Sequence, residues 1–104
     1  MTNEELGRRA VACKGWRWMP GMLSQDTGLR LDEMTDEWEG KVPDFSDPAT
    51  LGCLLALVRE ALDDSRIHCR ARANKFRVYS GVTPIGERAN SEGAALVAAL
   101  EVAE

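Results

Sequence analysis

The sequence predicts an α+β fold, in which a mainly antiparallel sheet of four or five strands is layered with three helices in the order α-β-β-(β)-α-β-β-α. Two segments carry most of this prediction. Residues 47–62 place apolar side chains at helical spacing behind good capping residues, and residues 66–79 alternate polar and apolar side chains as a β-hairpin does. The 104 residues, of which 44% are hydrophobic and 29% charged, fit one domain spanning residues 1–104.

The first predicted element is a short helix. Thr2 or Asn3 provides an N-cap, and Leu6 and Ala10 follow at helical spacing. Gly15 is expected to end this helix, because glycine is common just beyond a helix C-terminus.

Three strands are expected next, at Trp16–Leu23, Leu29–Met34 and Thr35–Val42. The first is bent by a Pro-Gly pair, and alternation places Trp16 and Trp18 on the same face. Two large aromatic side chains on one face are typical of a core. The same pair on the surface would instead form a contact site for a protein partner.

A second helix is predicted to begin at Pro48, because Asp47 is a good N-cap and proline is favoured in the first helical position. Residues 63–65, which are acidic and polar, are expected to end it. The apolar face of this helix is formed by Leu51, Leu54, Leu55, Val58 and Leu62.

A β-hairpin is predicted over residues 66–79, with a polar turn at residues 73 and 74 and one apolar and one basic face. A two-residue turn places Arg70 opposite Arg77, and like charges in such positions repel. The same turn pairs Arg72 with Lys75. The candidate residues for binding an anion or a partner on this hairpin are Arg66, His68, Arg70, Arg72, Lys75, Arg77 and Tyr79.

The chain then continues through residues 81–90, GVTPIGERAN, which are expected to form a loop because they combine glycine, proline and polar residues. Ser91 is a good N-cap for a last helix, which is rich in alanine and leucine.

Charge is segregated along the chain, whose net charge is −4. Residues 66–77 contain basic side chains and no acid, whereas residues 26–47 are strongly acidic. The basic hairpin has two explanations: an external anion such as a phosphate, a nucleotide or an acidic protein surface, or internal screening by the acids of Leu29–Met34 or of the turn that follows it. Within the acidic segment, the candidate contacts for a protein partner are Trp38, Asp36, Glu37 and Glu39.

The sequence contains no recognisable motif of a metalloprotease, an α/β-hydrolase or a nucleotide-binding loop. Cys13, Cys53 and Cys69 lack the spacing of metal ligands, and strand alternation points Cys69 away from His68. The sequence therefore predicts free thiols and a protein that is not an enzyme and uses no metal or cofactor. The negative net charge argues against general binding of duplex nucleic acid, and no apolar run is long enough to span a membrane.

Three segments of the sequence, WRWMPGM, DPATLG and ALVAAL, are together similar to a group of small hypothetical proteins encoded by tailed bacteriophages and prophages. The similarity runs from Trp16 to Leu100, and the order of elements resembles the phage ABA sandwich domain. The resemblance implies a phage-encoded protein of the host cytoplasm, which agrees with an N-terminus that lacks a signal-peptide pattern. It assigns no activity and no binding residue.

The leading functional hypothesis is a phage-encoded accessory protein that acts by binding, as an inhibitor of a host or anti-phage defence protein in an anti-CRISPR-like manner. An alternative is a protein that binds or sequesters a small ligand carrying phosphate, such as a nucleotide. A third is a minor structural or assembly protein of the virion. A homo-oligomer is compatible with each of these, because the hairpin would leave an edge strand to be covered.

Overall fold

The computed structural model describes residues 2–31 and 41–103. Within these residues the fold is α+β, as predicted, with three helices and one three-stranded antiparallel sheet in the order β1-β2-β3. The order of the described elements is α-α-β-β-β-α, which lacks the strands predicted before the second helix and has one more strand than predicted after it. The elements are α1 (Asn3–Val11), α2 (Pro48–Ala61), β1 (Ile67–Arg72), β2 (Lys75–Ser80), β3 (Thr83–Ala89) and α3 (Glu92–Val102).

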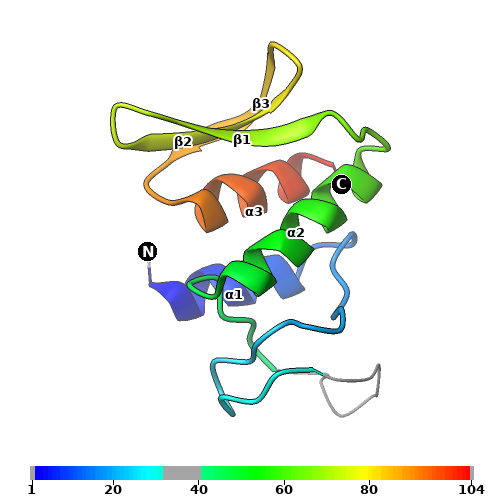
Figure 1. Cartoon of the computed structure of the whole chain (residues 1–104), viewed down its shortest axis with the longest axis vertical. Helices are drawn as coiled ribbons and strands as arrows, with labels where there is room; N and C mark the ends of the chain where they lie inside the picture. The colour runs from blue at the N-terminus through cyan, green and yellow to red at the C-terminus, as the bar shows by residue number, and fades with distance from the viewer. Residues whose placement is uncertain (1, 32–40, 104) are drawn as a thin grey trace.

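The molecule is arranged in three layers, and α3 lies in the middle one (Figure 1). One side of α3 packs against all three strands, and its other side packs against α1 and α2. The far end of α2 also reaches β1. One face of the sheet is therefore covered by a helix, while Figure 1 shows no helix over the opposite face.

Each helix begins where its capping residue predicts. Thr2, Asp47 and Ser91 are the N-caps of α1, α2 and α3, and each side-chain oxygen accepts a hydrogen bond from a backbone N–H in the first helical turn. The first helix is shorter than predicted, because it ends at Val11 with Ala12 as its C-cap rather than at Gly15.

A single apolar core fills the space around α3. The side chains of α3 are small enough for the sheet and the other helices to approach closely. Of the apolar face predicted for the second helix, Leu54 and Val58 belong to the buried core, and the other three residues are partly buried against it. Its fully buried members on regular elements include Leu54, Val58, Ile67, Val78, Leu96 and Leu100.

The strand predicted at Trp16–Leu23 is wrong. This segment contains a single isolated bridge, at Leu23, and no strand. Gly21 adopts a φ of +99° directly after Pro20, and this breaks the extended conformation. The chain instead turns back on itself, because the Gly21 N–H donates to the carbonyl of Leu31 over 2.8 Å.

The other two strands predicted before the second helix are not seen where they can be judged. Of Leu29–Met34, only Arg30 forms an isolated bridge, with Leu23, and residues 32–34 lie outside the described residues. Of Thr35–Val42, only Lys41 and Val42 are described, and neither belongs to a strand. The described sheet therefore has three strands rather than four or five.

The loop predicted over residues 81–90 is also wrong, because most of it forms β3. Val78 of β2 pairs with Ile85, but Phe76 pairs with Ala89, so β3 contains a bulge between these pairs. Gly86 sits in this bulge with a φ of +73°, and a Cβ on it would lie 3.2 Å from the backbone nitrogen of Ala99. Glycine here lets β3 lie directly on α3.

Candidate anion-binding face

The β1–β2 hairpin has the register predicted for it. Ala73 and Asn74 both have positive φ, 52° and 64°, which is the conformation of a two-residue type I′ turn. The strands then pair residue by residue, so that His68 lies opposite Tyr79, Arg70 opposite Arg77, and Arg72 opposite Lys75.

The two faces of this hairpin differ sharply in chemistry. Ile67 and Val78 are fully buried, and Cys69 and Phe76 pack against the same core, so these residues face α3. Successive side chains on a strand point to opposite faces, so the residues between them point away from α3. We call this surface the basic face, and it consists of His68, Arg70, Arg72, Lys75, Arg77 and Tyr79.

One end of the basic face is held rigid by three side chains in contact. The rings of His68 and Tyr79 are nearly parallel, at 23°, with centroids 6.1 Å apart, and the Arg70 guanidinium lies 5.3 Å from the Tyr79 centroid. Arg70 Nε donates to His68 Nε2 over 2.9 Å. Because an arginine nitrogen only donates, the His68 proton is on Nδ1, which lies 3.0 Å from the carbonyl oxygen of Arg66.

The arginine opposite is fixed by the backbone. Arg77 Nε donates to the carbonyl oxygen of Gly86 over 3.0 Å. Arg70 and Arg77 thus each use Nε within the fold, while their terminal Nη groups make no hydrogen bond among the residues that the structure describes. Two guanidinium ends on directly paired positions therefore stay open toward solvent.

The cations of the basic face have no carboxylate partner in the described part of the chain. None of the ion pairs in residues 2–31 and 41–103 involves Arg70, Arg72, Lys75 or Arg77. Lys75 Nζ is instead hydrogen-bonded to the side-chain oxygen of Asn90. The acids of Leu29–Met34 that could screen these cations, Asp32 and Glu33, lie outside the described residues, so internal screening stays an alternative.

Arg66, which was predicted to belong to the same surface, is separated from it by its pairing. It lies just before β1, and its Nε is 3.2 Å from Asp64 Oδ1. The Arg66 guanidinium and the Ser80 hydroxyl hold the pKa of the Asp64 carboxyl well below its usual range. The charge of Arg66 is thus paired with Asp64 just before the hairpin.

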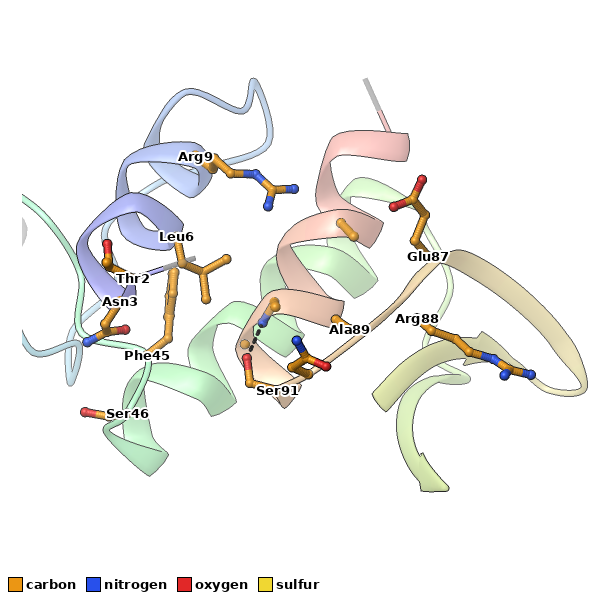
Figure 2. A pocket seen from close by; sticks show the side chains of 14 residues that line it. Thr2, Asn3, Leu6, Arg9, Phe45, Ser46, Glu87, Arg88, Ala89 and Ser91 are labelled. Atoms are coloured by element: carbon orange, nitrogen blue, oxygen red, sulfur yellow. Dashed lines mark hydrogen bonds between the residues drawn. The ribbon is translucent and has the colours of Figure 1, made fainter. Parts of the chain in front are cut away.

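Arg88 is a cation that the sequence interpretation missed, because its segment was predicted to be a loop. Ala89 pairs with Phe76 on the side of α3, so alternation places Arg88 on the opposite side of β3. Figure 2 shows the Arg88 side chain pointing away from α3. The sequence signal for this strand was the pair of apolar residues Ile85 and Ala89, which follow a turn that contains glycine.

The predicted protein-contact residues Trp38, Asp36, Glu37 and Glu39 lie outside the described residues. Three acids of the same segment are described, and the fold uses all of them. Asp26 accepts from the Val42 N–H, Asp44 accepts from the Asn3 side chain, and Asp47 forms two bonds with Arg30, which lowers the Asp47 pKa.

Trp16 and Trp18 belong to an aromatic cluster and not to a strand. Trp16 packs edge to face against Trp18 and Phe45, with centroids 5.5 Å and 6.1 Å away. Trp16 and Trp18 are half-buried, and Trp16 lies against the core. Core packing, the first of the two interpretations, therefore describes Trp16.

The cysteines are free, with Cys13 buried and Cys53 and Cys69 half-buried. Burial raises the pKa of the Cys69 thiol to about 11, so this side chain is protonated at neutral pH. Cys69 and His68 point to opposite faces and do not form a nucleophile and base pair. Among residues 2–31 and 41–103, no three metal-ligating side chains lie close enough together to hold a metal ion.

A cleft of about 500 Å³ lies on the other side of the sheet, between α1, β3 and the start of α3 (Figure 2). Leu6 and Phe45 line it with apolar surface, and Arg9 points toward α3 across it. Its polar groups are largely used by the fold, because Ser91 caps α3 and Arg9 pairs with Glu101. The basic face is the stronger candidate site, since its charges are not neutralised within the described chain.

Comparisons with protein-family models, with curated proteins and with solved structures find no match to this chain. The resemblance to small phage proteins therefore stays a prediction. No helix in the described residues is both long enough and apolar enough to cross a membrane.

Proposed function

We propose that this protein is a binding protein whose basic face takes up the phosphate groups of an anionic ligand. One observation carries the proposal: Arg70 and Arg77 lie directly opposite each other, and neither has a carboxylate partner among the described residues. Like charges in that position destabilise a sheet by a few tenths of a kcal/mol. A bound anion would remove this repulsion.

The open groups suit a phosphate, and the same planar fork also accepts a carboxylate. A guanidinium presents a planar fork of N–H donors that fits two oxygens of one phosphate. Since Nε of both arginines is already bound within the fold, the forks are positioned before a ligand arrives. Less side-chain freedom is then lost on binding.

Thermal unfolding with and without tripolyphosphate tests the proposal. A ligand present at about one hundred times its Kd adds about 2.7 kcal/mol to the free energy of unfolding, which raises the Tm by about 10 °C in a chain of this size. The double variant Arg70→Gln/Arg77→Gln should lose this rise in Tm.

The matched control is Arg8→Gln/Arg17→Gln, which removes the same charge from two exposed residues that pair with Glu4 and Glu60 and do not belong to the basic face. This variant should keep the full rise in Tm. An equal rise in both double variants, or none in the original chain, would overturn the proposal.

The wider hypothesis of a phage-encoded inhibitor of a host or defence protein also remains a proposal. Its contact residues lie outside the described part of the chain, and the described acids of residues 26–47 are bound within the fold. A pull-down from host lysate at low salt tests it, because charge-driven contacts weaken as salt is added. Recovery of the same proteins by a variant with Asp36, Glu37 and Glu39 changed to Ser would count against it.

A further inference from the structure

We infer that the ligand of the basic face is single-stranded nucleic acid, bound with its backbone along the cations and a base against the aromatic end. This inference rests on the proposed phosphate-binding function and names the class of ligand. It comes from the order in which the side chains follow one another across the two paired strands.

The basic face is a ladder of three rungs. Arg72 pairs with Lys75, Arg70 with Arg77, and His68 with Tyr79, so two cationic rungs are followed by one aromatic rung. Neighbouring rungs are two residues apart and hence about 6.6 Å apart along the strands. An extended nucleic-acid strand places its successive phosphates at a similar separation, with flat bases beside them.

The aromatic rung combines two half-buried rings with the Arg70 guanidinium, which lies over the Tyr79 ring. A base would stack on the ring surface that Arg70 leaves uncovered. The two rings are within 23° of parallel, and the hydrogen bonds of His68 to Arg66 and Arg70 fix its orientation. Proteins that bind single strands combine such rings, on which bases stack, with cations that follow the backbone. A free phosphate would occupy the cationic rungs and leave the rings unused.

The limited size of the face favours a single strand over a duplex. From the first rung to the third the ladder spans about 13 Å along the strands, which corresponds to a few nucleotides. The net charge of −4 leaves the rest of the molecule acidic, which would repel the second strand of a duplex.

An acidic peptide is the main competing ligand, since carboxylates on every second residue of an extended strand have the same spacing. One feature favours the nucleic acid, because the third rung offers rings rather than another cation. The open guanidinium forks of Arg70 and Arg77 suit a carboxylate and a phosphate alike.

Fluorescence anisotropy with labelled oligothymidylate and oligouridylate of about 12 nucleotides tests the inference. We expect the Kd of each oligonucleotide to be at least 10-fold lower than the Kd of a nucleoside triphosphate measured by competition. The plot of log K against log salt should have a slope of about −2, as expected for about three phosphates on a single strand.

Variants on the separate rungs sharpen the test. Arg70→Gln/Arg77→Gln should weaken oligonucleotide binding by more than 10-fold, and the control Arg8→Gln/Arg17→Gln should leave it unchanged. Tyr79→Ala should weaken binding about 10-fold, while Tyr79→Phe, which keeps the ring, should bind as the original chain does. Thermal melts of each variant show whether it is folded.

The outcomes separate the inference from the function on which it rests. If tripolyphosphate binds but oligonucleotides bind no more tightly, the phosphate site stands and the single-strand inference fails. If polyglutamate displaces the oligonucleotide at equal charge, or Tyr79→Ala binds normally while folded, the inference also fails. If neither tripolyphosphate nor an oligonucleotide binds, both proposals fall.

Discussion

The two faces of the sheet are built from the same strands and serve different purposes. On the face toward α3, Ile67 and Val78 are completely excluded from solvent and contact a helix of small residues. On the other face, Arg70 and Arg77 lie opposite each other with no acid to balance them among the described residues. A two-residue repeat thus divides the hairpin into a surface that stabilises the fold and a surface that is free to bind.

This difference means that substitutions on the two faces should have separate consequences. Removing an apolar side chain from the inner face should lower the free energy of unfolding, whereas removing a cation from the basic face should change ligand binding and leave stability nearly intact. Measuring both quantities for each variant shows whether the division holds.

The largest effect is expected for Leu96→Ala, which removes a fully buried side chain from the middle layer. A cavity of this kind costs about 3 kcal/mol in the free energy of unfolding. Urea denaturation followed by circular dichroism measures it. A loss below about 1 kcal/mol would mean that α3 is not the centre of the core.

Gly86→Ala should cost about 2 kcal/mol, because alanine disfavours a φ of +73° and its Cβ would press on the backbone of Ala98 and Ala99. The matched control is Gly52→Ala, since a Cβ at this exposed helical position meets nothing within 4 Å. The control should be neutral or stabilising by the same denaturation measurement. Equal behaviour of the two variants would contradict the close contact of β3 with α3.

The carboxylate of Asp47 contrasts with the cations of the basic face, because the fold uses its charge. Asp47 caps α2 and forms two bonds with Arg30, which lowers the Asp47 pKa. Asp47→Ala should therefore cost about 1–2 kcal/mol at neutral pH.

The pH dependence of that loss follows from the sign of the shift. A carboxyl group with a lowered pKa stabilises the fold above its unfolded pKa of about 4, and this contribution is lost as the pH falls further. The difference in stability between the original chain and Asp47→Ala should accordingly shrink below about pH 4. A difference that stays constant down to pH 2 would show that Asp47 does not act through its charge.

The smallest change in stability is expected for Arg70→Gln. Removing one of two like charges across the strands gains a few tenths of a kcal/mol, and losing the contact with Tyr79 costs a similar amount. The free energy of unfolding should therefore change by less than about 0.5 kcal/mol, while binding of tripolyphosphate is reduced. A loss above about 1 kcal/mol would give Arg70 a structural role.

The sequence was most informative where local rules decide the structure. Asp47 and Ser91 marked the starts of two helices, and the Ala73-Asn74 turn determined the register of the hairpin and therefore the composition of the basic face. These features depend on neighbouring residues, so they can be predicted without knowing what packs against them.

The sequence was misleading where distant contacts decide. Residues 16–23 alternate like a strand, but Trp16 packs against Phe45, which is distant in the sequence. The Gly21 N–H donates to the Leu31 carbonyl, which lies beyond the following turn. Residues 83–89 contain Pro84 and Gly86, which disfavour strands in general. Here Pro84 lies on an edge strand, where proline is tolerated, and Gly86 is required by the approach of α3.

The central position of α3 has a consequence for how the protein is made. A ribosome synthesises residues 92–102 after α1, α2 and all three strands, yet each of those elements buries its apolar surface against α3 or close to it. Until α3 is synthesised, the apolar sides of the hairpin and of the first two helices therefore stay exposed. Chains in such a state are prone to aggregation. The layers described here come together only after α3 has left the ribosome and enters between the two layers made before it.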